Sequence, residues 1–213
     1  MHTQTRRQRF AIPIFLLLPL FFTGQLGGPD ADTRFVKQIG RDRWENPEAI
    51  LDTLGIRPGM VIGEVGAGTG YFTFLLSERV GGSGKIYAND INRRSLSTLR
   101  ARASRNDLAN IEIIQGEVEQ TNFPAATMDM VVMVYVFHDF TEPLAMMENI
   151  KLSLKPGAPV VIIDADHDRI RDRSQHFLSR EQLIERVTEA GYELVRIETY
   201  LPDDNIYVFK PLT

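Results

Sequence analysis

Residues 60–70 read MVIGEVGAGTG, and this stretch decides the fold class of the chain. An apolar run ends at the acid Glu64, three glycines follow at positions 66, 68 and 70, and a helical pattern of apolar residues begins at Phe72. A strand, a glycine turn and a helix in this order bring backbone N–H groups up to a nucleotide-like ligand in an open α/β sheet. The next apolar run, KIYAND, ends at Asp90, which is well spaced to accept hydrogen bonds from ribose hydroxyls.

The details of the glycine turn separate two classes of ligand. A dinucleotide fingerprint needs a third glycine for close packing of the helix, and that position is occupied here by the bulky Tyr71. Glu64 would repel a pyrophosphate and suits a ligand that carries a positive charge. The chain also lacks any Tyr-x-x-x-Lys proton relay, which disfavours a short-chain nicotinamide dehydrogenase. The non-functional alternative is an ordinary strand–turn–helix unit with structural glycines.

The stretches GEVGAGTGYFT (63–73) and YANDIN (87–92) resemble motifs I and II of class I S-adenosylmethionine-dependent methyltransferases. The resemblance implies S-adenosylmethionine as the cofactor, bound by Glu64, Gly66, Ala67, Gly68, Gly70, Asp90, Ile91, Glu117, Val118 and Tyr135. In such a site Glu64 lies next to the amino group of the cofactor, and Asp90 holds the ribose. Ile91 packs on the adenine, Glu117 accepts from its exocyclic amine, and the backbone of Val118 reads the ring edge.

The run YVFHDF (135–140) is similar to an apolar-His motif of small-molecule methyltransferases, including quinone-biosynthesis C-methyltransferases. The resemblance makes Tyr135 and His138 the candidate catalytic residues, with Tyr135 bordering the methionine end of the cofactor. His138 could deprotonate an acceptor hydroxyl, since histidine titrates close to working pH. Alternatively, His138 only holds its loop through a hydrogen bond. Methyl transfer to a good nucleophile needs mainly positioning, so the expected function does not require a base.

Acidic residues gather after the fourth and fifth expected strands, namely Asp139, Asp164 and Asp166. Catechol O-methyltransferase-like enzymes bind Mg²⁺ with acids at these places, but their Asp-Asn pair is absent here and arginines follow at 169, 171 and 173. We therefore expect no metal and interpret residues 164–168 as part of a charged, mobile substrate loop.

The only tryptophan, Trp44, is placed either to cover the cofactor as a lid or to pack on the sheet.

Alternating strand and helix patterns predict a Rossmann-like α/β fold with a seven-stranded, mostly parallel sheet. Strands are expected at 60–65, 85–89, 111–115, 128–136, 160–164, 192–199 and 205–209. Ser179 is expected to cap the last helix. The last two strands are joined by a short connection and must pair antiparallel, because a parallel crossover needs a dozen or more residues. A parallel sheet that ends in an antiparallel hairpin also resembles the methyltransferase fold.

Composition narrows the function classes. The 213 residues carry a net charge of −4, which gives no broad electrostatic footprint for nucleic acid, and the arginines of the expected helix 93–105 indicate a solvated face. There is no cysteine, so disulfides, thiolate metal sites and a cysteine nucleophile are excluded. The resemblance described above implies methyl transfer to a small-molecule acceptor as the expected function. The alternative is a non-catalytic cofactor-binding module, against which the intact glycines and both ligand acids argue.

We expect two regions, a leader at 1–30 and a methyltransferase domain at 31–213. Residues 10–22 read FAIPIFLLLPLFF and follow three arginines, as in a signal peptide, but they are too short for a typical membrane span. Export conflicts with a cofactor that is made in the cytosol. Three interpretations stay open: export, a membrane anchor on a cytoplasmic domain, and an upstream start codon that extends a soluble protein.

Overall fold

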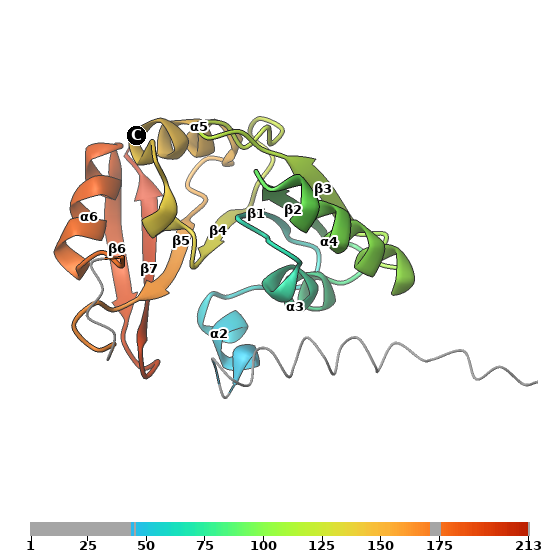
Figure 1. The fold of residues 1–213 in the computed structure, drawn as a ribbon, viewed down its shortest axis with the longest axis horizontal. Coiled ribbons are helices and arrows are strands. Elements are labelled where there is room, and N and C mark those ends of the chain that lie inside the picture. Colours follow the sequence, from blue (N-terminus) through green and yellow to red (C-terminus); the bar gives the residue numbers. More distant parts are fainter. Residues whose placement is uncertain (1–43, 45, 171–175, 213) are drawn as a thin grey trace, which may run out of the picture.

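The computed structural model describes Trp44 and residues 46–170 and 176–212, so the expected leader at 1–30 lies outside the described residues. Its centre is a sheet of seven strands (Figure 1): β1 (Val61–Val65), β2 (Lys85–Asp90), β3 (Ile111–Gln115), β4 (Met130–Val134), β5 (Val160–Ala165), β6 (Tyr192–Glu198) and β7 (Asp204–Pro211). The strand order is β3-β2-β1-β4-β5-β7-β6. The expected Rossmann-like fold is confirmed.

The sheet is parallel from β3 to β5, and β7 pairs antiparallel with both β5 and β6. The expected antiparallel hairpin is thus confirmed. The chain proceeds from β1 outward to β2 and β3 and then returns to β4 on the other side of β1. In open α/β sheets, the crevice at such a reversal, at the carboxyl ends of the strands, is where ligands bind.

Helices cover both faces of the sheet (Figure 1): α2 (Pro47–Thr53), α3 (Tyr71–Val80), α4 (Arg93–Arg105), α5 (Pro143–Ser153), α6 (Arg180–Glu189) and the 3₁₀ turn η1 (Phe137–Asp139). The apolar sides of α2, α3 and α4 pack in one buried cluster and those of α5 and α6 in another, with alternate residues of the strands facing each. Ser179 caps α6 as expected, because its side chain and that of Gln182 form a reciprocal capping box.

The fourth strand is shorter than expected. It ends at Val134 instead of residue 136, because Tyr135 adopts a left-handed backbone conformation with φ of +53°. The chain then turns into η1, which carries His138 and Asp139 away from the sheet direction. An apolar run gives no sign of such a turn, so the end of the strand could not be read from the sequence.

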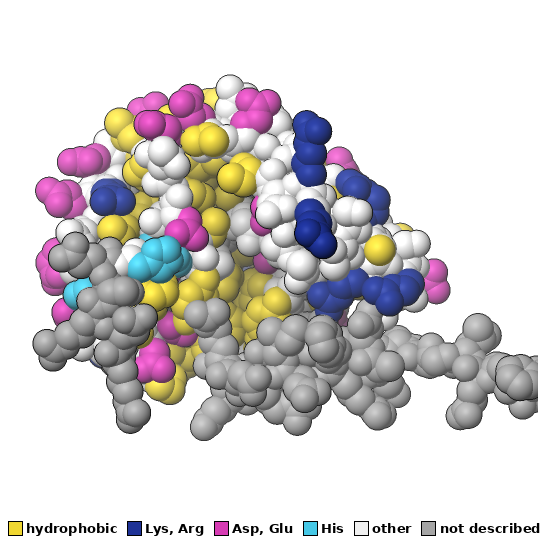
Figure 2. Space-filling view, viewed as in Figure 1, with side chains coloured by type: hydrophobic (Ala, Val, Ile, Leu, Met, Phe, Trp, Pro, Cys, Tyr) yellow, Lys and Arg dark blue, Asp and Glu magenta, His cyan; other side chains and the backbone are white. Residues whose placement is uncertain are grey.

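Helix α4 carries its arginines mainly as expected, with Lys and Arg side chains gathered over this part of the molecule (Figure 2). Arg102 is the exception, since it is buried and its Nη1 donates to the carbonyl of Thr69 at 2.7 Å. Its guanidinium also lies 4.8 Å above the ring centre of Phe74. This arginine therefore supports the turn after β1.

Among the described residues, no helix is long and apolar enough to cross a membrane.

Candidate active site

A cleft of about 320 Å³ opens at the carboxyl ends of the parallel strands, where the strand order reverses. Its lining includes six of the residues expected to bind the cofactor: Gly66, Asp90, Ile91, Glu117, Val118 and Tyr135. The volume falls within the range of small-molecule sites, from about 300 to 1,000 Å³. Residues from four different loops thus meet in one concave site.

The glycine turn after β1 leaves its backbone accessible to a ligand. Gly66 has φ of +76°, and a Cβ there would come within 2.5 Å of Val136, so only glycine fits. Gly68 also has positive φ, at +55°, but a Cβ there would meet nothing within 4 Å. The first glycine therefore allows close packing of the turn, while the second borders open space. This arrangement suits a cofactor that approaches the backbone.

Asp90 connects the end of β2 to the glycine turn. Its Oδ2 accepts a hydrogen bond from the Gly68 amide at 2.7 Å, and its Oδ1 accepts from the Asn92 amide at 2.7 Å. Each carboxylate oxygen can accept more than one hydrogen bond, so this orientation leaves capacity for ribose hydroxyls. The backbone donors fix the carboxylate before any ligand arrives.

Glu64 lies beneath the turn instead of in the cleft wall. Its side chain is buried and accepts a hydrogen bond from the Thr73 hydroxyl at 2.5 Å. Burial raises the pKa of Glu64 from 4.5 to about 7; the hydrogen bond from Thr73 opposes this rise and the charge of Asp90 adds to it. The expected contact with the cofactor's amino group stays a prediction.

Ala67 and Gly70, the other two expected cofactor-binding residues of the turn, set its backbone conformation. Ala67 is buried, and its amide donates to the carbonyl of Asn89 at 2.8 Å. Gly70 caps α3 with φ of +97°, where a Cβ would come within 2.4 Å of Leu99. Neither residue lines the cleft, so they contribute through the backbone path of the turn.

Two exposed apolar side chains mark the end of the cleft assigned to the adenine. Ile91 is 59% exposed and Val118 is 49% exposed, although both are large and apolar. They line the same cleft together with Glu117, which follows β3. Apolar side chains left open beside a carboxylate suit a flat ring with an exocyclic amine, as the sequence predicts for the adenine.

Tyr135 lines the cleft and is held from behind. Its hydroxyl donates to one carboxylate oxygen of Asp204, and the other oxygen accepts from Trp44 Nε1 at 2.7 Å. Trp44 is only 1% exposed and packs with ring centroids 6.0 Å from Tyr71 and 6.2 Å from Tyr135. Trp44 therefore packs on the sheet, as one of its two interpretations expects, and it is not among the residues that line the cleft.

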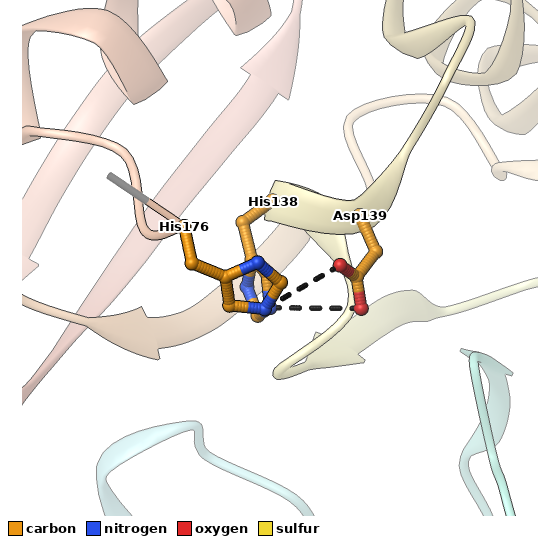
Figure 3. A group of neighbouring side chains, drawn as sticks. All are labelled: His138, Asp139 and His176. Carbon is orange, nitrogen blue, oxygen red and sulfur yellow. Dashed lines mark ion pairs between the residues drawn. The ribbon is translucent and has the colours of Figure 1, made fainter. Parts of the chain in front are cut away.

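His138 is fixed by a buried acid. Its Nδ1 lies 2.8 Å from both carboxylate oxygens of Asp164, and the two side chains are 4% and 3% exposed. Its Nε2 lies 3.6 Å from Asp139, which lines the cleft although His138 itself does not (Figure 3). Sequence reasoning placed His138 beside the acceptor without identifying Asp164 as its partner.

The acids after β5 do not form a mobile loop over residues 164–170. Asp166 is buried and accepts from Arg169 Nε at 2.9 Å, Arg180 at 3.1 Å and Asn205 at 2.9 Å. Burial raises its pKa, but the hydrogen bonds from Asn205, the backbone amide of Asp168 and the two arginines lower the pKa overall. The expected mobility is therefore wrong for Asp166, because Arg169, Arg180 and Asn205 hold its carboxylate in place. Residues 171–175 lie outside the described part of the chain.

Comparisons with known proteins show similarity to methyltransferases. A model of the family described as methyltransferase domain matches residues 56–197. The demethylmenaquinone methyltransferase of Lactococcus lactis is 32% identical over 127 residues, which cover 60% of this chain and 50% of that protein. The ubiquinone/menaquinone biosynthesis C-methyltransferase UbiE of Idiomarina loihiensis is 29% identical and covers 54% of this chain and 46% of that protein.

Solved structures extend the similarity to the fold. A SAM-dependent methyltransferase from Aquifex aeolicus superposes with a TM-score of 0.74 and 27% identity, covering 78% of this chain and 90% of that one. The [4+2]-cyclase SpnF shares the fold at a TM-score of 0.65 and 14% identity, covering 78% and 80%. The chain spans about half the length of the two curated relatives named above. With the family model covering more than half of its residues, the chain belongs to the S-adenosylmethionine-dependent methyltransferase family.

Proposed function

We propose that this protein transfers a methyl group from S-adenosylmethionine to a small-molecule acceptor. The observation that carries the proposal is the cleft at the reversal of strand order, in which Asp90 is hydrogen-bonded to the amide of Gly68. An acid at the end of β2 that is fixed to an open glycine turn suits a nucleoside. The acid would bind the ribose, and the rest of the ligand would lie along the turn. When bound, the cofactor supplies an electrophilic methyl group on a sulfonium.

The residues of the cleft divide into groups by the part of the cofactor that they would hold. The turn at Gly66–Gly70 would lie against the methionine part, and Asp90 would accept from the ribose hydroxyls. Ile91 and Val118 contact the adenine faces, and Glu117 accepts from its amine. Glu64 lies below the turn, where a positive ligand nearby favours the ionised carboxylate and lowers its pKa.

The acceptor would bind on the side of the cleft formed by the loop after β4. Tyr135 contributes its ring, since its hydroxyl is engaged by Asp204. Because Asp164 holds Nδ1 of His138, Nε2 is the nitrogen through which this histidine would act on the acceptor. Positioning of the acceptor against the methyl group is the main requirement of the reaction.

We propose demethylated quinols as the first acceptors to test. Two curated relatives are named as enzymes of menaquinone or ubiquinone biosynthesis, and the acceptor side of the cleft carries the apolar side chains of Val136, Phe140 and Met146. An apolar wall suits an aromatic acceptor better than a highly charged one. The net charge of −4 disfavours nucleic acid as the acceptor or partner.

For the leader we propose attachment to a membrane with the domain on the cytoplasmic side. The basic residues before the apolar run at 10–22 favour a membrane contact, and the cytoplasm supplies the cofactor. Cell fractionation with protease protection tests this placement. A protease-sensitive domain in intact spheroplasts would instead support export.

Turnover tests the proposed activity directly. The purified chain is incubated with methyl-labelled S-adenosylmethionine and either demethylmenaquinol or a metabolite extract, and products are separated and identified by mass. We expect labelled product and one equivalent of S-adenosylhomocysteine per methyl transferred, both strongly reduced in Asp90→Ala. Cofactor binding without any methylated product from either source would favour the non-catalytic module.

A further inference from the structure

Three potential metal ligands meet beside the cleft: His138, Asp139 and His176 (Figure 3). Their donor atoms all lie within 4.8 Å of one another, and the Nε2 atoms of His138 and His176 each lie 3.6 Å from an Asp139 oxygen. Two of the residues come from η1, and the third precedes α6. Ligands at about 2.0–2.2 Å from a tetrahedral metal stand about 3.3–3.6 Å apart, so small side-chain rotations bring these atoms into range.

A second observation points to a metal at this place. Metal-binding histidines almost always donate their other ring N–H to a carboxylate or carbonyl, which fixes the tautomer and the ring orientation. Nδ1 of His138 has this arrangement with the buried Asp164, at 2.8 Å from both oxygens. The amide of Ala165 in turn donates to Asp164 at 2.9 Å and fixes the carboxylate. Nε2 of His138, the other ring nitrogen, lies on the side of the ring where Asp139 and His176 lie.

The surroundings suit a site with open coordination positions. The ring of Phe177 packs against both imidazoles, with centroids 4.6 Å from His138 and 5.0 Å from His176, and limits their rotation. Asp139 faces the cleft and is 58% exposed in its side chain, so the other side of the cluster is open to solvent and ligand. Three protein ligands with an open position are typical of catalytic zinc sites.

We propose that His138, Asp139 and His176 bind a divalent transition metal of the zinc class, whose open positions take an oxygen of the acceptor. The binding of the acceptor to the metal rests on the proposed methyltransferase function. Two imidazoles and one carboxylate favour Zn²⁺, Co²⁺ or Fe²⁺ over Mg²⁺, which prefers oxygen ligands. Nε2 of His138 then acts on the acceptor through the metal. The sequence-based expectation of no metal considered the acids after the fourth and fifth expected strands and did not include His176.

Metal binding is tested on the untagged full chain with Co²⁺ as a spectroscopic probe and Zn²⁺ in competition with a chromophoric chelator. We expect one ion per chain, with visible Co²⁺ absorption bands that Zn²⁺ removes and Mg²⁺ does not. Affinity should fall at least tenfold in His176→Ala and Asp139→Asn. Asp164→Asn should weaken binding by about 10- to 100-fold, as other substitutions of such supporting carboxylates do. His167→Gln is the matched control, because this histidine lies outside the cluster and should leave affinity unchanged.

S-adenosylhomocysteine calorimetry on the same samples separates the two proposals. Absence of stoichiometric Co²⁺ binding, or equal Co²⁺ affinity in His176→Ala, Asp139→Asn and wild type, overturns the metal site, whether or not the cofactor product binds. Normal Co²⁺ binding with no binding of S-adenosylhomocysteine overturns the methyltransferase function and with it the acceptor role of the metal. We expect both to bind, and turnover of the chelator-treated enzyme to recover with Zn²⁺.

Discussion

At the scale of single residues, the buried carboxyl of Glu64 makes stability depend on pH. Its pKa rises from 4.5 to about 7 on folding, mainly because burial disfavours the charged form. Between these two values the folded state binds more protons than the unfolded state, so the free energy of unfolding falls as pH rises through this range. The loss from this one group is complete above pH 7 and is on the order of 3 kcal/mol.

Glu64→Gln should remove this part of the pH dependence, because the amide resembles the protonated acid and does not titrate. We expect the stability of the variant relative to wild type to increase between pH 5 and pH 8, by up to about 3 kcal/mol. Urea unfolding of both proteins at the two pH values gives the comparison, and other titrating groups cancel. The same stability difference at both values would show that Glu64 is ionised over the whole range.

Asp90→Ala tests the residue assigned to the ribose. We expect binding of S-adenosylhomocysteine to weaken by about 1.5–3 kcal/mol, the range for hydrogen bonds to a charged group. The fold should survive, because the side chain lies at the end of β2 and, within the described part of the chain, accepts from the amides of Gly68 and Asn92. Calorimetry measures the affinity, and Glu78→Ala, an exposed acid on α3, is the control. If Asp90→Ala binds S-adenosylhomocysteine with wild-type affinity, the assignment of Asp90 to the ribose is wrong.

At the scale of elements, the glycine turn offers a matched pair of substitutions. Gly68 and Gly157 both have positive φ, at +55° and +75°, and a Cβ at either would meet nothing within 4 Å. Valine should therefore strain both positions by a similar amount, on the order of 1–2 kcal/mol. Only Gly68→Val should abolish binding of S-adenosylhomocysteine, because only this side chain enters the ligand's space. Equal affinities of the two variants in calorimetry would place the ligand elsewhere.

The elements that the sequence predicts well are those with local signals. The strand, turn and helix from Val61 to Val80 follow from an apolar run, spaced glycines and helical periodicity, and Ser179 follows from its capping pattern. The end of β4 does not, because the left-handed conformation at Tyr135 interrupts an apolar run without a glycine or asparagine. The burial of Arg102 likewise depends on its hydrogen bond to the distant Thr69 carbonyl.

At the scale of the whole molecule, the parts of the site that sequence reasoning missed are long-range contacts. The hydrogen bond between Trp44 and Asp204 joins residues 160 positions apart, and the pair His138–Asp164 joins two successive strand ends. Periodicity and spacing report on neighbours within a few turns or one strand, so they carry no information on such pairs. The contact between the rings of His138 and His176 is also formed by the fold, so the sequence alone did not reveal it.

Deletion of residues 1–30 should leave a folded domain with unchanged cofactor affinity. Among the residues that the structure describes, the two buried clusters run from Trp44 to Phe209. The apolar run at 10–22 lacks the spacing of an amphipathic element. Circular dichroism and calorimetry with S-adenosylhomocysteine on the truncated and full chains provide the comparison. Unfolding or weaker binding after truncation would mean that the leader is part of the fold.

The central claim is that the cleft beside Asp90 and the glycine turn binds S-adenosylmethionine. Calorimetric titration of the purified chain with S-adenosylmethionine, S-adenosylhomocysteine and NAD tests it most directly. We predict one binding site per chain for each of the first two ligands, none for NAD, and the stated loss of affinity in Asp90→Ala. Binding of NAD in place of S-adenosylmethionine, or of neither, would contradict the account.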